Sequence, residues 1–181
     1  MIAMKILDLL LGAILARLYR WVGLAGLRPN MNRVTQNVWV GGINHPDVIA
    51  NEGFDAVLDL RTKDAGKYRW SLEESGIEYF NVRIPDDHGA PPEILLKIVQ
   101  WIANRIKLGK KILIHCNLGR GRAPLAMVSY LVHEGATAES AIKSIKEKRR
   151  VTFLNAEQNA ALEKFSDSIS PRGTGDENRR Y

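Results

Sequence analysis

The sequence predicts an α/β fold with a small, largely parallel central sheet flanked by helices. Short runs rich in β-branched and aromatic residues fill the first half of the chain, as expected of strands. A segment with apolar residues at helical spacing separates these runs from one further strand-like run, and only helical patterns follow. This order of strands, helix, strand and helices is typical of a domain in which helices cover a parallel sheet.

The elements of the first part are short strands and one long helix. Strands are expected at residues 34–42, 55–60, 78–84 and 111–115. The last of these, KILIH, has the continuous apolar character of a buried strand. A helix is expected from Pro92 to Lys107, because proline is favoured at a helix start and Gly109 ends the apolar pattern.

The elements of the second part are all helical. Helices are expected at residues 124–133, 137–148 and 155–166, the last two capped by the side chains of Thr137 and Asn155. Residues 32–168 then form one domain, which is an ordinary size for a chain of 181 residues. The polar, glycine-bearing segment 169–181 is predicted to be a disordered tail.

The first 27 residues are predicted to form an amphipathic helix. Lys5, Asp8, Arg17 and Arg20 fall within one half of the helical wheel, and leucine, isoleucine and tryptophan fill the other half. The longest uncharged stretch, residues 9–16, is far too short to cross a bilayer. Two interpretations remain open: the helix packs on its own domain, or it is an anchor that lies on a membrane surface.

The net charge and the cysteine content indicate which partners and which cellular compartment to expect. The net charge of +6 favours phosphorylated groups, anionic lipid or nucleic acid. Nucleic acid is not expected as a partner, because the chain has no recognisable element for reading it. The single cysteine, Cys116, excludes an internal disulfide and fits a cytoplasmic, reducing compartment, with peripheral membrane attachment as a further expectation.

The stretch KILIHCNLGRGRAP places this cysteine where a predicted strand ends and a helix is about to begin. Free amides and the dipole at a helix start favour an anion, and Gly119 and Gly121 permit backbone conformations that aim successive amides inward. The same positive field favours the thiolate form of Cys116, a nucleophile. Arg122 can turn back and bind two oxygens with its planar guanidinium. The plain alternative is that Cys116 is only a packed core residue.

Related loop motifs do not fit these residues. The loop lacks the third glycine of a dinucleotide fingerprint and the Gly-Lys-Ser/Thr of a Walker loop. His115 is predicted to fix the loop geometry through hydrogen bonds of its ring rather than to serve only as packing.

The pattern His115-Cys116-x-x-Gly119-x-x-Arg122 resembles the signature loop of the cysteine-based protein tyrosine phosphatase superfamily, in its dual-specificity branch, over about residues 32–165. The resemblance implies the fold of these phosphatases and hydrolysis of phosphoproteins through a cysteinyl phosphate, with no metal or organic cofactor. The substrate phosphate would be bound by the residues of the loop: Asn117, Leu118, Gly119, Arg120, Gly121 and Arg122.

The same resemblance implies a general acid in the stretch IPDDHGAPP. Asp87 is favoured because it lies four residues before Pro91, and Asp86 is the alternative. The family context implies that Gln158 would position the attacking water, although an ordinary surface glutamine on a helix is the favoured interpretation.

Ala123 departs from the family pattern, in which serine or threonine follows the arginine and stabilises the departing thiolate. Slow turnover is therefore predicted, and a phosphate-binding module that turns over slowly or not at all is one alternative function. Transfer of sulfur, as in rhodanese-like proteins, is disfavoured because their loop places the arginine closer to the cysteine.

Two subgroups share features with this chain. The loop ending GRAP, the sequence Lys148-Arg149-Arg150 and DDHGAPP resemble the phosphatases of regenerating liver, although their prenylated C-terminal cysteine is absent. Arg120 and the apolar N-terminal helix resemble the mitochondrial phosphatidylglycerophosphate phosphatases. A phospholipid phosphatase acting at a membrane surface is therefore the other alternative. Basic residues expected in a loop beside the site fit an anionic substrate or membrane: Arg61, Lys63, Lys67 and Arg69.

Overall fold

The computed structural model describes residues 2–63 and 66–170, with side chains from residue 9 onward. Almost all of the tail predicted to be disordered, residues 171–181, lies outside the described residues. A five-stranded sheet forms the centre, in the order β1-β2-β5-β3-β4. Its strands are β1 (Met31–Arg33), β2 (Val38–Gly41), β3 (Ala56–Asp59), β4 (Glu78–Asn81) and β5 (Ile112–His115). Only the β1–β2 pair is antiparallel, so the predicted largely parallel sheet is confirmed.

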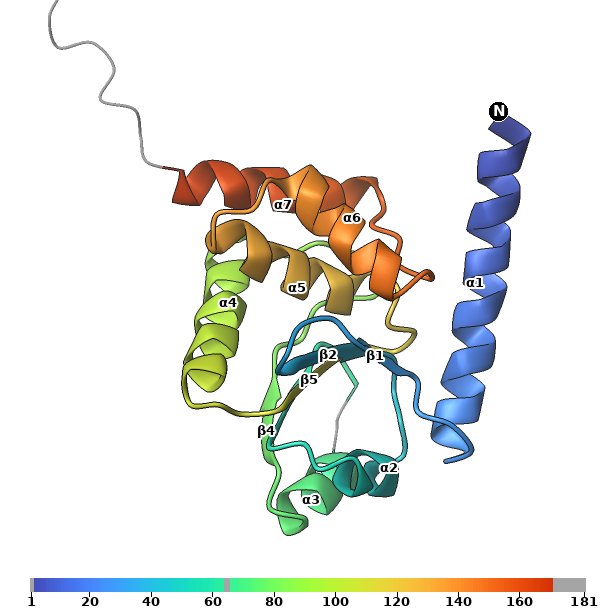
Figure 1. Cartoon of the computed structure of the whole chain (residues 1–181), viewed down its shortest axis with the longest axis vertical. Coiled ribbons are helices and arrows are strands. Elements are labelled where there is room, and N and C mark those ends of the chain that lie inside the picture. Colours follow the sequence, from blue (N-terminus) through green and yellow to red (C-terminus); the bar gives the residue numbers. More distant parts are fainter. Residues whose placement is uncertain (1, 64–65, 171–181) are drawn as a thin grey trace, which may run out of the picture.

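Helices cover both faces of this sheet (Figure 1). The described helices are α1 (Ile2–Leu24), α2 (Pro46–Asn51), α3 (Gly66–Glu74), α4 (Pro92–Lys107), α5 (Arg122–His133), α6 (Ala138–Lys148) and α7 (Ala156–Ile169). Helices α4 to α7 pack on one face, and the short helices α2 and α3 lie on the other. The helix α1 lies alongside the domain, outside these layers.

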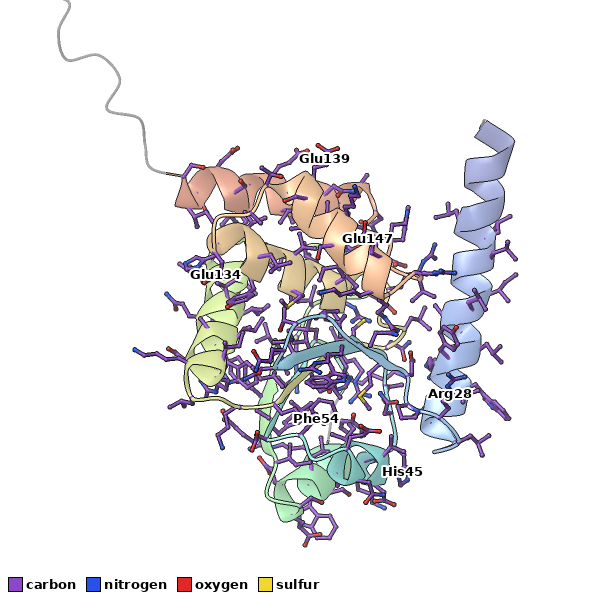
Figure 2. All side chains as sticks on the ribbon, in the orientation of Figure 1. Arg28, His45, Phe54, Glu134, Glu139 and Glu147 are labelled. Atoms are coloured by element: carbon purple, nitrogen blue, oxygen red, sulfur yellow. The ribbon has the colours of Figure 1, made fainter. Side chains whose placement is uncertain are left out.

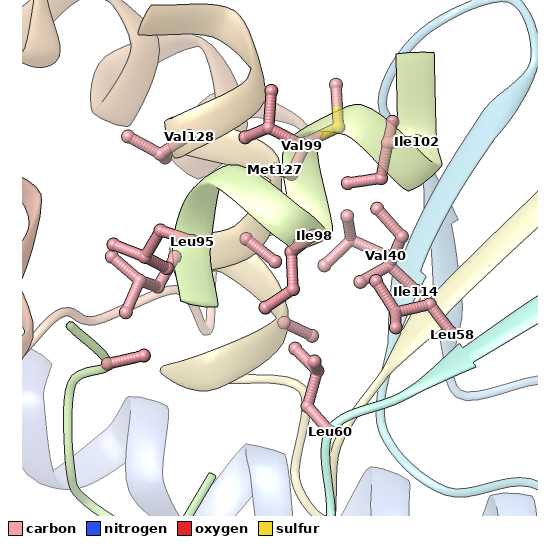
Figure 3. Close-up of a cluster of buried hydrophobic side chains, with 14 of the residues drawn as sticks. Val40, Leu58, Leu60, Leu95, Ile98, Val99, Ile102, Ile114, Met127 and Val128 are labelled. Atoms are coloured by element: carbon pink, nitrogen blue, oxygen red, sulfur yellow. The ribbon is translucent and has the colours of Figure 1, made fainter. Parts of the chain in front are cut away.

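Alternate residues of the strands point to opposite faces and build two cores. Val40, Leu58 and Ile114 join the larger cluster, under α4 and α5 (Figure 3). Their neighbours Val57 and Leu113 point the other way, into a smaller cluster with α2 and α3. All four residues of β5 are buried, as expected of a central parallel strand. The central position of β5 fixes the place of the cysteine that follows it.

The structure differs from the prediction mainly before residue 78. The strand expected at 34–42 begins only at Val38, because the amides of Val34 and Thr35 both donate to the carbonyl of Val38 and close a turn. Helices α2 and α3 were not predicted, since α2 is only six residues long and Leu72 is the one buried residue of α3. Residues 67 and 69, expected in a loop, therefore lie on a helix.

From residue 9 onward, the helix α1 leaves most of its large apolar side chains exposed to solvent. Ala16 is buried against the domain, whereas large apolar residues along the helix are exposed: Leu9, Leu10, Leu11, Ile14, Leu15, Leu18 and Trp21. None of the described helices has the length and apolar character needed to cross a bilayer. The helix contacts the domain through residues such as Gly23, whose carbonyl accepts from His45, and it also leaves apolar surface open, so both interpretations of this segment remain predictions.

Candidate active site

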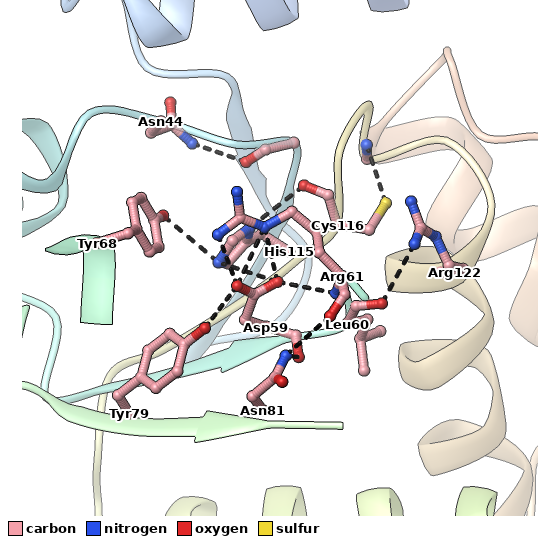
Figure 4. Close-up of polar contacts among 12 residues, drawn as sticks. Asn44, Asp59, Leu60, Arg61, Tyr68, Tyr79, Asn81, His115, Cys116 and Arg122 are labelled. Atoms are coloured by element: carbon pink, nitrogen blue, oxygen red, sulfur yellow. Dashed lines mark hydrogen bonds and ion pairs between the residues drawn. The ribbon is translucent and has the colours of Figure 1, made fainter. Parts of the chain in front are cut away.

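The loop between β5 and α5 forms around the cysteine. Cys116 follows the last residue of β5, and α5 begins at Arg122, two residues earlier than predicted. The Cys116 side chain is buried, and its sulfur accepts a hydrogen bond from the amide of Gly119 at 3.2 Å. This chain geometry brings Cys116 and Arg122 to the same end of the sheet (Figure 4).

Hydrogen bonds from outside the loop hold its carbonyls outward. The carbonyl of residue 117 accepts a hydrogen bond from the amide of Ile43. The carbonyls of residues 118 and 119 accept from the guanidinium of Arg149, and the carbonyl of residue 120 accepts from the amide of Phe153. In a trans peptide the N–H points opposite to the preceding C=O. The amides of residues 118–121 therefore face the interior, as the Gly119 bond to sulfur shows. The result is a cradle of amide donors suited to an oxyanion.

Two glycines of this loop are required by close contacts. Gly119 has a φ of +67°, and a Cβ there would overlap the backbone of Gly41 and Gly42. At Gly121, a Cβ would lie 2.6 Å from the side-chain amide of Gln158. The predicted role of both glycines in shaping the loop thus agrees with the contacts around them.

The guanidinium of Arg122 is buried and fixed by backbone carbonyls. Its Nη1 donates to the carbonyls of Ile84, at 2.9 Å, and Leu60, at 3.3 Å. Its Nη2 lies 2.7 Å from the carboxylate of Asp86. Its buried Nε has no partner among the described residues. Arg122 is thus held in one orientation with donor capacity left for an anion.

The loop between β4 and α4 that carries the two candidate acids, here called the acid loop, is held by the start of α7. Asn155 donates to the carbonyl of Asp87 at 2.6 Å, and Gln158 donates to the carbonyl of His88 at 3.3 Å. Asp87 has a φ of 60°, which is uncommon for a residue other than glycine. Asp86, rather than the favoured Asp87, places its carboxylate on Arg122.

Gln158 is buried, so the alternative of a surface glutamine is wrong. It forms a capping box with Asn155. The Oε1 of Gln158 accepts a hydrogen bond from the backbone N–H of Asn155, and the backbone N–H of Gln158 donates to the Oδ1 of Asn155. Its side-chain amide lies against Gly121 of the cysteine loop and bonds to the acid loop. Gln158 therefore connects the two loops of the site.

His115 supports the cysteine loop from the buried side. Its Nδ1 donates to the Cys116 carbonyl at 3.2 Å, so Nε2 is the nitrogen that accepts from the hydroxyl of Tyr68 at 3.4 Å. Burial lowers the pKa of His115, although the nearby carboxylate of Asp59 opposes this effect. A buried, doubly hydrogen-bonded ring agrees with the predicted geometric role.

Asp59 and Arg61 form a buried ion pair beneath His115. The guanidinium of Arg61 donates to both carboxylate oxygens at 2.6 to 3.0 Å and lies over the ring of Tyr68. Burial alone would raise the pKa of Asp59, but His115, Arg61 and the hydroxyl of Tyr79 outweigh it and lower this pKa to about 2. The charge of Arg61 is therefore paired with Asp59. The prediction that Arg61 presents a free positive charge to the substrate is wrong.

The other basic residues expected beside the site are exposed. Lys63 precedes α3, Lys67 lies on it, and Arg69 pairs with Glu73 one helical turn away. Among residues 2–63 and 66–170, no group of three histidine, cysteine or acidic side chains is arranged to hold a metal ion.

Arg149, which the sequence distinguished only as part of Lys148-Arg149-Arg150, is a buried cation. Its guanidinium donates to the carbonyls of Leu118 and Gly119 and to the side chains of Asn30 and Asn32, at 2.6 to 3.1 Å. Burial lowers the pKa of Arg149 to about 10, against the attraction of Cys116, and leaves it charged at neutral pH. A positive charge thus lies under the carbonyls of the cysteine loop.

Two loop residues point their side chains toward α1 instead of into the cradle. Asn117 accepts a hydrogen bond from Arg20 at 2.7 Å. Arg120 donates to the carbonyl of Leu9 at 3.1 Å and lies over the ring of Phe153. Of the residues predicted to bind phosphate, Leu118, Gly119, Arg120 and Gly121 turn their amides into the cradle, and Arg122 lies beside it with its guanidinium. The helix α1 is therefore in direct contact with the candidate active site.

Comparison with known proteins identifies the family. The model of the dual specificity phosphatase catalytic domain matches residues 39–168. The chain belongs to this family, and it is a phosphatase of the protein tyrosine and dual-specificity type, as the signature loop predicted.

Individual relatives and structures agree with this family. Human protein tyrosine phosphatase type IVA 3 is 36% identical over 118 residues, which cover 62% of this chain and 65% of that protein. The structure of Tk-PTP in its active form gives a TM-score of 0.70 at 27% identity, over 78% of this chain and 99% of that one. The structure of PTPMT1 in complex with PI(5)P gives a TM-score of 0.70 at 19% identity, over 77% of this chain and 96% of that one. This similarity concerns the fold alone.

Proposed function

We propose that this chain hydrolyses phosphomonoesters of phosphoproteins through a cysteinyl-phosphate intermediate at Cys116. One observation carries the proposal: the Cys116 sulfur accepts an amide hydrogen bond within a cradle of inward amides, and the buried guanidinium of Arg122 lies at the same end of the sheet. Amide donors and a fixed guanidinium stabilise the charge that spreads over the phosphoryl oxygens in the transition state.

The proposed mechanism has two steps. The Cys116 thiolate attacks phosphorus, the bond to the leaving oxygen breaks, and an aspartic acid of the acid loop gives that oxygen its proton. Water then attacks the cysteinyl phosphate, its proton returns to the aspartate, and the sulfur leaves as thiolate with release of phosphate. Gln158, which connects the two loops, is suited to orient this water.

The test is release of phosphate from a panel of substrates by the full chain. Phosphotyrosine, phosphoserine and phosphothreonine peptides are compared with phosphatidylglycerophosphate and phosphoinositides, with Cys116→Ser as the blank. We expect release from the peptides by the wild type only. Release that persists in Cys116→Ser would contradict the proposal, and tight binding of phosphate without release would favour the phosphate-binding module.

Asp86 is our candidate for the general acid, because its carboxylate already faces Arg122 at 2.7 Å. Asp86→Asn is expected to lose about 10²-fold in kcat with an alkyl phosphate, whose leaving oxygen needs a proton, and far less with p-nitrophenyl phosphate. Asp87→Asn is the matched comparison and should change both rates little. The reverse pattern would assign the role to Asp87, as the sequence favoured.

Ala123 is fully buried directly after Arg122, and a hydroxyl there is expected to speed the second step. A hydrogen bond to the departing thiolate in Ala123→Ser should increase hydrolysis of the cysteinyl phosphate about tenfold. Rapid-quench measurement of the intermediate under single-turnover conditions checks this. Unchanged decay of the intermediate would show that the missing hydroxyl does not limit turnover.

A second candidate function is hydrolysis of phospholipid at a membrane surface. The exposed apolar side chains of α1, such as Ile14 and Trp21, favour it, because a helix of this kind can lie in a membrane interface. Arg20 of the same helix donates to Asn117 of the site, so this part of the helix contacts the domain while Ile14 and Trp21 remain exposed. Peripheral attachment to a membrane in the cytoplasm is part of this proposal. The lipid substrates of the panel, presented with and without anionic vesicles, test it.

A further inference from the structure

A cavity of about 510 Å³ lies between α1 and the domain, beside the cysteine loop. Its volume is within the range of ordinary ligand pockets. Figure 2 shows side chains that project from α1 both toward the domain and away from it. The residues that characterise the cavity are Leu9, Leu11 and Leu15 on α1, and Lys146, Arg150 and Phe153 on the domain.

The apolar part of this cavity comes mainly from the helix. Leu9, Leu11 and Leu15 are 38%, 47% and 41% exposed, and Phe153 opposite them is 41% exposed. Apolar surface left open on both sides of one cavity is stabilised when another apolar group fills it. A flexible hydrocarbon chain fits between these two walls.

The polar part is strongly positive. Arg120, Lys146 and Arg150 line the cavity, and no carboxylate is among the described residues that line it. Two acidic residues of the described part of the chain lie outside the lining: Asp87 acts on Arg120 from the acid loop, and Glu147 borders a neighbouring hollow on α6. Three cations in one lining favour a ligand with negative charge.

Two buried polar atoms of the same lining also lack a partner. The hydroxyl of Thr152 and the Nε of Arg120 are buried without a hydrogen bond to any described residue. Unsatisfied buried polar groups are costly and uncommon in native proteins. Oxygen atoms of a bound headgroup would satisfy both groups.

We propose that this cavity binds one molecule of an anionic phospholipid taken from a membrane. The phosphate would lie at Lys146, Arg150 and Thr152, and an acyl chain would lie along the leucines of α1. The outward residues of the same helix, Ile14 and Trp21, would rest in the bilayer, so the cavity opens where a lipid can enter. This site is separate from the catalytic cradle, and it does not depend on the proposed phosphatase reaction.

The experiment uses the full chain with Cys116→Ser, so that no substrate is turned over. Monomeric dihexanoyl phosphatidylglycerol is titrated by calorimetry, beside dihexanoyl phosphatidylcholine and free glycerol phosphate. We expect only the first to bind well, because it has both the negative headgroup and the chains. Replacing Lys146 and Arg150 together by glutamine should weaken its binding about thirtyfold. Lys143→Gln, on the same helix but outside the cavity, should leave it unchanged.

A second pair of variants tests the apolar wall. Leu11→Asp places a charge in the cavity and should abolish lipid binding, whereas Ile14→Asp, on the outward side of the same helix, should retain it. Thermal unfolding of each variant shows that the domain is folded. Because Ile14 is exposed and does not line the cavity, its variant should lose only adsorption to anionic vesicles.

Three outcomes would overturn this proposal. One is loss of lipid binding in Arg122→Ala, since the lipid would then occupy the catalytic cradle. Another is equal weakening by Lys143→Gln, which would indicate general attraction to a basic surface. The third is equally strong binding of glycerol phosphate, which would remove the role of the chains. A wild-type chain that releases no phosphate but passes these tests would refute the catalytic proposal alone.

Discussion

Arg122→Lys is expected to lower kcat about 10³-fold while leaving the protein folded. A lysine keeps the charge but loses the planar guanidinium, whose Nη1 is fixed by the carbonyls of Ile84 and Leu60. Its single ammonium cannot bond these two carbonyls and also two phosphoryl oxygens. Removal of one fixed donor to a developing negative charge commonly costs 10²- to 10³-fold, and an arginine at a transferring phosphoryl group contributes at least as much.

The measurement separates this loss from a loss of binding. Burst kinetics with p-nitrophenyl phosphate should show slower formation of the cysteinyl phosphate in Arg122→Lys. The matched control is Arg69→Lys, an exposed arginine paired with Glu73 on α3, which should keep the wild-type rate. A variant of Arg122 that forms the intermediate at the normal rate would show that this guanidinium does not stabilise the transition state.

The cysteine loop was predictable because its chemistry is local. Cys116, Gly119 and Arg122 lie within seven consecutive residues, and a strand before them and a helix after them fix their relation. The helix caps were predictable for the same reason. The side chains of Thr137 and Asn155 both accept hydrogen bonds from backbone amides in the first turn of their helices, as predicted. Each of these predictions needed only neighbouring residues.

The support of the loop could not be predicted, because it depends on residues far apart in the chain. Arg149 bonds to Asn30, which is 119 positions away, and nothing in the local sequence distinguishes it from the exposed Arg150. Asp59 and His115 likewise meet only because β3 and β5 are paired in register. A charged residue at a helix end is usually solvated, and only the tertiary structure shows which one is buried.

The acid loop lies between these two cases. Its position between β4 and α4 was predictable, and so was the presence of two adjacent carboxylates. Which of them faces Arg122 depends on the backbone, and here Asp87 has a positive φ while its carbonyl is held by Asn155 of α7. Sequence spacing alone favoured Asp87, but the constraint that turns Asp86 toward the arginine comes from another helix.

Arg149→Met is expected to destabilise the folded protein by about 3 to 5 kcal/mol. Methionine fills a similar volume, but it leaves the carbonyls of Leu118 and Gly119 and the oxygens of Asn30 and Asn32 without their donor. In a chain of this size the melting temperature should fall by roughly 10 °C. The neighbouring exposed residue gives the control, since Arg150→Met should change the melting temperature little.

The same variant is also expected to weaken the nucleophile, which a purely structural role of Arg149 would not do. Its charge lies close enough to interact with Cys116, and its hydrogen bonds turn the loop carbonyls away from the sulfur. Arg149→Met should therefore slow alkylation of Cys116 by iodoacetamide at neutral pH, measured at a temperature where the variant is fully folded. Arg149→Lys should restore part of this rate through its charge, but less of the stability, because an ammonium has only three donors. If alkylation of Cys116 in the folded Arg149→Met variant matches the wild type, the buried cation acts on the stability of the loop and not on the sulfur.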